Sequence, residues 1–211
     1  MENRIDHIVI GAATLDDGVK ALESSLGVTV PSGSKHDAMS THNCVMQIGN
    51  SAFLEVIAID PDAPPPGRAR WFSLDAPETQ ARLGKGPAAL TWVVNTNDLD
   101  GLVAASPIDL GEIVEFRRGD RTWRLTVPQD GSLLMGGLVP SFIEWSPGPH
   151  PSTAQADLGI QLETIKIQSE DPERLTDLFT GLNILHLAQI EPGEPRLRFG
   201  FATPTGDVVF G

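Results

Sequence analysis

One short pattern occurs twice in this sequence and limits the folds that the chain can adopt. Residues 51–60 read SAFLEVIAID and residues 140–149 read PSFIEWSPGP, so each stretch places phenylalanine, an aliphatic residue and glutamate in succession. Both stretches are rich in the aromatic and β-branched residues that favour strands. Because side chains alternate across a strand, Phe53 and Glu55 share one face. A carboxylate among apolar side chains needs a cation, a proton or a hydrogen-bond donor, so Glu55 and Glu144 are candidate site residues.

The segments that precede these two strands repeat as well. Residues 4–10 and 90–95 are predicted strands, and each is followed by a predicted helix, with Leu15-Asp16 corresponding to Leu99-Asp100. Self-similarity of this kind usually reflects repeated supersecondary units that pack together. A third, shorter copy opens with a predicted strand over residues 162–168. We expect a first βαβββ module over residues 1–60, a connecting segment over 61–88, a second module over 89–150 and a third, degenerate module over 158–211.

Charge and cysteine content exclude several classes of partner. The chain of 211 residues carries a net charge of −13, whereas nucleic acids and anionic membranes bind basic surfaces. Its single cysteine, Cys44, excludes an intrachain disulfide and gives no sign of secretion. We find neither a signal peptide nor a run of about 20 apolar residues. The sequence predicts a cytoplasmic protein whose partner is a small molecule, with no nucleic-acid and no membrane partner.

Several motifs in their order resemble the vicinal oxygen chelate superfamily, and more closely its glyoxalase-like domain proteins. The motifs are Ile5-Asp6-His7-Ile8-Val9-Ile10, Thr41-His42-Asn43, Phe53-Leu54-Glu55-Val56-Ile57, Arg70-Trp71-Phe72 and Phe142-Ile143-Glu144-Trp145, followed by His150-Pro151. The resemblance covers nearly all of residues 4–155 and, more weakly, residues 160–211. It implies an α+β fold in which paired βαβββ modules form a curled-sheet cup, here with a third, shorter module of the same kind.

The resemblance also implies a divalent metal in the cup, held by the first and last strands of each module. Carried over position by position, it implies His7, Glu55 and Glu144 as ligands. Thr91 occupies the fourth position, where it is a poor ligand that leaves room for water or substrate. The metal would be Zn, Mn, Fe, Mg or Ni, its identity left open by this donor set.

Each of these assignments has an alternative. His7 can equally be a strand histidine whose ring nitrogens are satisfied by neighbours. Glu55 and Glu144 can pair with arginines instead of a metal. Two carboxylates in one cavity need a cation, a proton or an arginine between them, and we expect the cation.

Further residues are candidates for binding a substrate. Thr41 and Asn43 share a strand face that can line the cup, and His36 lies in a predicted loop that can close over a ligand. Arg121 and Trp123 share a face of a predicted hairpin and can hold an anionic, ring-bearing substrate. The alternative for this hairpin is an ordinary solvated edge.

Two functions remain open. The first is an enzyme that uses a divalent metal to transform a small oxygenated organic molecule by isomerase, lyase or ring-cleavage chemistry, with Glu55 and Glu144 as catalytic carboxylates. The second is a metal-free protein that binds or sequesters a small molecule on the same fold, which Thr91 favours. We also expect a homodimer through residues 162–211, because the third module has no fourth partner within the chain.

Overall fold

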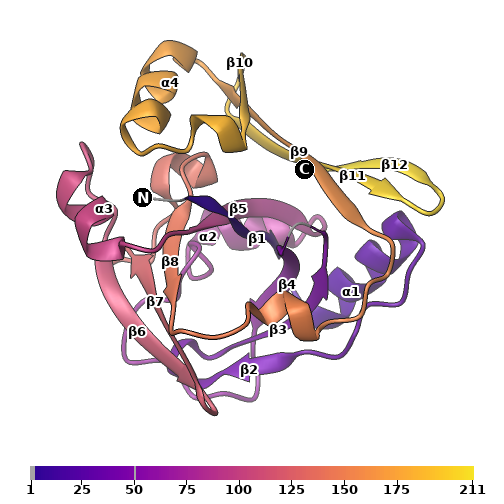
Figure 1. Cartoon of the computed structure of the whole chain (residues 1–211). Coiled ribbons are helices and arrows are strands. Elements are labelled where there is room, and N and C mark those ends of the chain that lie inside the picture. The colour runs from indigo at the N-terminus through magenta and orange to yellow at the C-terminus, as the bar shows by residue number, and fades with distance from the viewer. Residues whose placement is uncertain (1–2, 50) are drawn as a thin grey trace.

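The computed structural model of the protein describes residues 3–49 and 51–211, which form three successive βαβββ modules (Figure 1). The first module contains β1 (Arg4–Gly11), α1 (Leu15–Leu26), β2 (Ser34–His36), β3 (Thr41–Gln47) and β4 (Phe53–Ile59). The second contains β5 (Ala88–Asn95), α3 (Leu99–Ala105), β6 (Glu112–Arg118), β7 (Arg121–Val127) and β8 (Ser141–Trp145), after a connection that carries α2 (Pro77–Leu83). The third contains β9 (Gln161–Ser169), α4 (Pro172–Gly181), β10 (Gln189–Pro192), β11 (Arg196–Thr203) and β12 (Gly206–Phe210).

The first two modules share one curled sheet with the strand order β2-β3-β4-β1-β5-β8-β7-β6. β1 and β5 pair antiparallel at its centre, and each pairs in parallel with the last strand of its own module. The sheet curls until its two edge strands meet, where Arg118 of β6 donates a hydrogen bond to the Ser34 hydroxyl of β2. The predicted α+β cup is therefore confirmed, and in Figure 1 it curls around a central space.

Local sequence signals set the limits of the first helix. The Thr14 side chain accepts a hydrogen bond from the Asp17 amide at 3.2 Å, as an N-cap should. Gly27 ends α1 in the left-handed conformation with φ of 70°, which glycine adopts at little cost. The helix thus occupies the predicted residues 15–26.

The two faces of the curled sheet build separate apolar clusters. The inner face gathers Val9 and Ile57 with Trp71 and Phe72 of the connection. The outer face belongs to the larger cluster, in which Trp92 of β5 packs with residues of the third module. Each large apolar side chain so buried contributes about 1.5–3 kcal/mol to stability.

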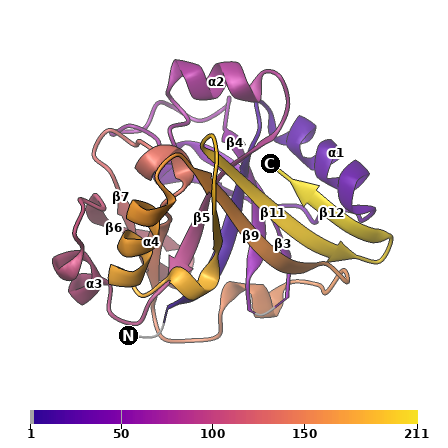
Figure 2. The ribbon, with the colours of Figure 1, turned by 90° about the horizontal axis from the view of Figure 1, so that it is seen from above.

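The third module packs on the outside of the cup. Its strands form a second sheet in the order β10-β9-β11-β12, which lies across the larger sheet in the view from above (Figure 2). Phe199 and Phe201 of β11 and Phe179 of α4 are buried in the outer cluster, and the Phe179 ring lies 5.8 Å from that of Trp92. The apolar face that suggested a homodimer is therefore covered within the chain, and association stays a prediction.

Two stretches with strand-like sequences do not form strands. Residues 133–136 read as a strand, but Leu134–Gly137 is a short helical segment, because Met135 and Gly136 have φ values of 45° and 66° that no strand accommodates. Residues 28–30 also read as a short strand, but within the described chain the strand forms later, as β2, and it includes His36, which was predicted to lie in a loop. None of the helices within residues 3–49 and 51–211 is long and apolar enough to span a membrane.

Candidate active site

The cup encloses a cavity of about 50 Å³, which has room for a few water-sized groups. Polar side chains converge on it from the strands of both modules and from the segment that follows β8. Those that line it are His7, His36, Asn43, Glu55, Arg118 and Gln155, between the aromatic rings of Phe53, Trp71, Phe72, Trp123 and Trp145. The cavity is therefore the place where ionisable groups and aromatic surface meet.

His7 and Glu55 are brought together by neighbouring strands. β1 and β4 run in parallel, with Val9 opposite Glu55, and the His7 Nε2 atom lies 3.8 Å from Glu55 Oε2. Both residues are buried, and the His7 ring stacks on Phe53 with ring centroids 4.5 Å apart. The predicted proximity of His7 and Glu55 is confirmed.

Asp6, which the sequence patterns did not single out as a site residue, contacts the Nδ1 atom of His7, whereas Nε2 lies toward Glu55. The pairing of β1 with β5 shifts between Ile5 and His7, so Asp6 is the extra residue of a β-bulge. Its Oδ1 atom lies 2.6 Å from His7 Nδ1. Strict alternation would place Asp6 and His7 on opposite faces, and only the bulge lets their side chains meet.

The second oxygen of Asp6 collects three further donors. Oδ2 lies 2.7 Å from the Trp145 indole nitrogen, 3.0 Å from His150 Nε2 and 3.2 Å from the Asn95 amide nitrogen. Burial would raise the pKa of Asp6, but the hydrogen bonds from His150 and His7 and their charges outweigh it and hold this pKa far below its usual range. Asp6 is thus a carboxylate, and it accepts a hydrogen bond from the Nδ1–H group of His7. His150 belonged to a recognised motif, but its place beside Asp6 depends on the loop after β8.

Glu55 is positioned by the neighbouring strand β3. The Asn43 side-chain amide donates to Glu55 Oε1 at 2.5 Å, and His36 Nε2 lies 4.0 Å from the same oxygen. Thr41 does not line the cavity, but its hydroxyl lies 3.3 Å from His36 Nδ1. Burial lowers the pKa of His36, and the nearby Glu55 carboxylate only partly opposes this effect. His36, Asn43 and Thr41 thus form the polar wall next to Glu55.

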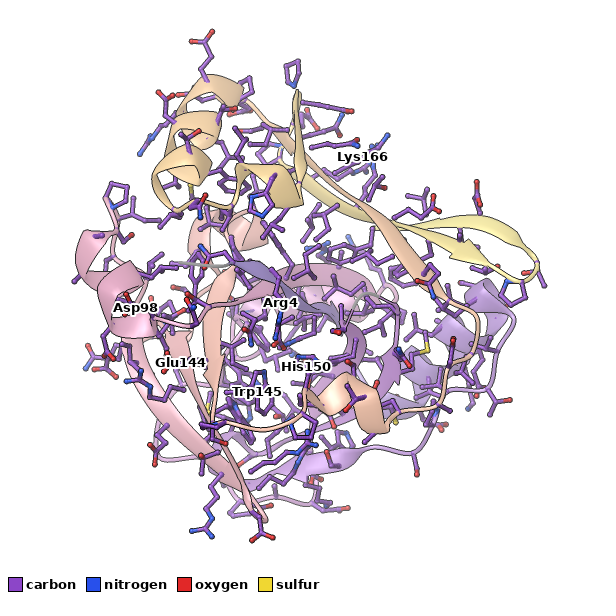
Figure 3. The ribbon with its side chains drawn as sticks, viewed as in Figure 1. Arg4, Asp98, Glu144, Trp145, His150 and Lys166 are labelled. Carbon is purple, nitrogen blue, oxygen red and sulfur yellow. The ribbon has the colours of Figure 1, made fainter. Side chains whose placement is uncertain are left out.

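Glu144 does not share this cavity, so the prediction that it meets His7 and Glu55 is wrong. Phe142 packs in the outer cluster and Ile143 in the inner one, so Glu144 projects from the outer face of β8. There it forms a close ion pair with Arg124 and accepts from the Leu99 amide at 3.4 Å. Figure 3 shows Glu144 beside Asp98 at the start of α3. Of the three ways to neutralise this carboxylate, an arginine is the one found.

Two candidate substrate residues also lie elsewhere. Thr91 is buried, does not line the cavity, and donates its hydroxyl hydrogen bond to the Trp92 carbonyl at 3.3 Å. Arg121 lies at the hairpin end of β7, beyond the cavity lining. Trp123 does line the cavity, and the basic group near it is Arg118, whose guanidinium carbon lies 5.9 Å from the Trp123 ring centroid. Of the predicted pair of substrate-binding residues, Trp123 therefore lines the cavity and Arg121 does not, and the arginine in the lining is Arg118.

Two buried polar atoms of the cavity lining have no hydrogen-bond partner among residues 3–49 and 51–211. They are the indole nitrogen Nε1 of Trp71 and the amide oxygen Oε1 of Gln155. A buried donor or acceptor left unpaired costs about 1–3 kcal/mol. A bound molecule that accepts from Trp71 and donates to Gln155 would recover this free energy.

The residues present do not fit a metal held by both modules. His7 and Glu55 supply two donors from the first module, but the second supplies none, since the Thr91 hydroxyl is directed to the backbone and Glu144 faces outward. Among residues 3–49 and 51–211, no three side chains of His, Cys, Asp or Glu are grouped as a metal site requires. Zinc sites in enzymes usually have three protein ligands. The predicted set of His7, Glu55 and Glu144 is therefore not a metal site.

Comparisons with known proteins agree with this architecture. A hypothetical protein from Staphylococcus aureus has a similar structure, with a TM-score of 0.61 and 16% sequence identity over 100% of this chain and 85% of that chain. A methylmalonyl-CoA epimerase from Mycobacterium tuberculosis gives a TM-score of 0.44 and 18% identity over 71% of this chain and 91% of its own. No curated protein matches. The model of the Glyoxalase_3 family, described as a glyoxalase-like domain, matches residues 5–182. The chain therefore belongs to the glyoxalase-like domain family.

Proposed function

We propose that this protein is an enzyme that transfers a proton within a small oxygenated organic molecule bound in the cup. The observation that supports the proposal is the alignment of three buried ionisable side chains, Asp6, His7 and Glu55, the last two of which line the cavity. Burial of ionisable groups costs free energy, and groups buried in this way cluster at functional sites, where catalysis needs them. The proposal keeps the isomerase-type chemistry expected from the sequence and assigns it to side chains rather than to a metal.

Glu55 is the proposed base. Its Oε1 atom accepts from Asn43, so Oε2 remains directed toward His7 across a space of 3.8 Å. A substrate carbon next to a carbonyl group carries an acidic proton that Oε2 can take. The C–H bond then breaks, its electron pair becomes that of an enolate, and Glu55 holds the proton.

His7 is the proposed donor to the enolate oxygen. Asp6 accepts from Nδ1 at 2.6 Å, so the ring is held with Nε2 toward the cavity. When both nitrogens of the His7 ring carry a proton, Nε2–H donates a hydrogen bond to the oxygen on which negative charge develops and keeps its proton, while the Asp6 carboxylate stabilises the charged ring. Return of the proton from Glu55 to another carbon, or to the other face of the same carbon, completes an isomerisation or epimerisation.

The unpaired atoms of the lining indicate what the substrate carries. Within the described part of the chain, the Trp71 N–H group has no acceptor and the Gln155 side-chain oxygen has no donor. A molecule with a carbonyl or carboxylate oxygen and a hydroxyl group satisfies both. The cavity of about 50 Å³ limits the enclosed part to a few non-hydrogen atoms.

Exchange of solvent deuterium tests this function without knowledge of the product. The protein is incubated in D₂O with small hydroxyaldehydes, hydroxyketones and 2-keto acids, and the loss of C–H signals is followed by proton NMR. We expect exchange with at least one compound and a rate at least about 100-fold lower for Glu55→Gln. Glu144→Gln is the matched control, because it makes the same chemical change outside the cup, and it should keep the rate. Equal exchange by the wild-type protein and Glu55→Gln would overturn the proposal.

A metal-free binding protein is the second candidate. The aromatic lining favours it, because Phe53, Trp71, Phe72, Trp123 and Trp145 offer flat surfaces that stack on ring-bearing molecules. Titration of tryptophan fluorescence with aromatic acids and flat dyes measures such binding. Saturable binding that Trp123→Leu weakens, together with no deuterium exchange in any compound, would favour this function over the enzyme.

A further inference from the structure

A second cavity lies where the third module meets the rest of the chain, away from the cup. It has a volume of about 580 Å³ and is lined from α2, the start of β5, the segment after β7 and the start of β11. In the view from above, the beginning of β11 lies close to α2 (Figure 2). The cavity therefore joins two parts of the fold that are distant in the sequence.

Three cationic side chains line this cavity, and among the described residues no Asp or Glu side chain does, although Gly211 also lies in the lining. They are Arg82 at the end of α2, Lys85 just after it, and Arg196 at the start of β11. The whole chain has a net charge of −13, so a group of three cationic side chains with no Asp or Glu side chain among them is unusual in it. Among the described residues no ion pair involves Arg82, Lys85 or Arg196, although other arginines pair with carboxylates.

The cations repel one another in the absence of an anion. Burial lowers the pKa of Arg82, and the positive charge of Arg196 lowers it further. The Arg82 guanidinium also donates to the Ala89 carbonyl at 2.8 Å, which fixes its position at the cavity. An anion that binds near both cations would offset their repulsion.

The remaining lining is apolar and open. Met135, a large hydrophobic residue that is 44% exposed, contributes to it together with Pro87 and Pro195. A Cβ atom added to Gly86 or Gly136 would have no heavy atom within 4 Å, so space is free beside both glycines. The cavity thus offers room and apolar contact next to its cations.

We propose that this cavity binds a small molecule that carries a phosphate group, with the phosphate between Arg82, Arg196 and Lys85 and the apolar part against Met135. Guanidinium groups bind phosphate oxygens through paired, charge-assisted hydrogen bonds, and lysine adds a compact charge. A dianion replaces the repulsion among three cations by attraction. Because the ligand would contact both α2 and β11, its binding should also stabilise the packing of the third module.

Pyrophosphate and inorganic phosphate are suitable probes, measured by isothermal titration calorimetry and by phosphorus NMR. We expect saturable binding of pyrophosphate and an affinity at least about tenfold lower for the double variant Arg82→Gln/Arg196→Gln. Arg174→Gln, which removes an exposed charge on α4, is the control and should bind as the wild-type protein does. Circular dichroism verifies that each variant is folded.

Citrate and sulfate at equal ionic strength separate a phosphate site from general attraction of anions. Pyrophosphate binding that is lost in the double variant and not displaced by sulfate supports the proposal. The proposal is wrong if the wild-type protein binds neither probe, or if the double variant binds pyrophosphate as tightly as the wild-type protein does. It is also wrong if citrate and sulfate bind the wild-type protein as tightly as pyrophosphate does. A rise in melting temperature with pyrophosphate, absent from the double variant, would support the predicted link to the third module. None of these results depends on the chemistry of the cup.

Discussion

The Asp6 carboxylate and the His7 imidazole, consecutive residues of one strand, face each other at 2.6 Å. The bulge in β1 makes this contact possible, and the other oxygen of Asp6 is occupied by Trp145, His150 and Asn95. One buried carboxylate therefore links the first strand, the central partner strand, the last strand of the cup and the loop after it. The orientation of His7 and the closure of the cup depend on the same residue.

Replacement of Asp6 by asparagine should destabilise the protein strongly. The amide cannot accept from four donors as the carboxylate does, and breaking a buried ion pair costs about 3–5 kcal/mol. We expect the free energy of unfolding, measured in urea, to fall by about 3 kcal/mol or more. Asp16→Asn removes a surface pair with Lys20 and should change it by less than about 1 kcal/mol. A loss from Asp6→Asn no larger than that of the control would contradict this role.

The same carboxylate predicts a loss of stability in acid. The pKa of Asp6 is lower in the folded protein than in the unfolded chain, where it is about 3.9. Its contribution is therefore complete above about pH 4 and is lost as the pH falls further, because the unfolded chain takes up the proton first. Unfolding free energies between pH 5 and about pH 2.5 should fall more steeply for the wild-type protein than for Asp6→Asn, and parallel curves would be the contrary result.

His36 predicts a second pH dependence, at higher pH. Burial lowers the pKa of His36 in the folded state, whereas the unfolded residue titrates near about 6.5. Its contribution to stability is present above about pH 6.5 and decreases as the pH falls toward the folded-state value. The fall between about pH 7 and pH 5 should be smaller for His36→Gln than for the wild-type protein. Substitution of the exposed His186 by glutamine is the control, and an equal effect of both substitutions would refute the assignment.

Arg118 should hold the two edge strands of the cup, β2 and β6, together. It bonds Ser34 on the opposite edge strand and lies over the Trp123 ring. Arg118→Met should increase quenching of tryptophan fluorescence by acrylamide while changing stability by no more than about 1 kcal/mol. Arg117→Met serves as control, because Arg117 bonds only within its own hairpin among the described contacts. Identical quenching in both variants would show that Arg118 does not hold the edges together.

The predicted homodimer can be tested by light scattering. The third module covers its apolar face against the cup, so a dimer through this module would use an edge strand such as β12, where Val209 is 69% exposed. If residues 162–211 form the interface, Val209→Lys should convert a dimer into a monomer. A monomeric mass for the wild-type protein would make the prediction wrong.

The sequence predicted the order of the modules well because helix and strand periodicities repeat along the chain. It did not predict which face of β8 lines the cup. Phe142 and Ile143 are both buried, so the pattern of apolar residues cannot choose between the two faces, and a shift of one residue exchanges them. Glu144 was therefore assigned to the wrong side. Trp145, on the correct side, was visible in the same motif but is not a typical metal ligand.

The role of Asp6 was hidden for another reason. A bulge is set by the pairing of β1 with β5, and no local periodicity reveals it. The neighbours of Asp6 in space, Trp145 and His150, come from the end of the second module. The motif before His7 did contain the residue, but alternation along a regular strand placed its side chain on the opposite face from the histidine.

The position of the third module has a consequence for synthesis of the chain. Phe199 and Phe201 of β11 cover the outer face of β1 and β5, so this face stays exposed until the last strands have been made. During translation the first two modules emerge early with their outer apolar surface unprotected, a state that invites association with other nascent chains. The outer apolar face of the cup is thus covered only by the third module, and chaperones that shield apolar surface should act on the ribosome-bound chain up to the release of β11.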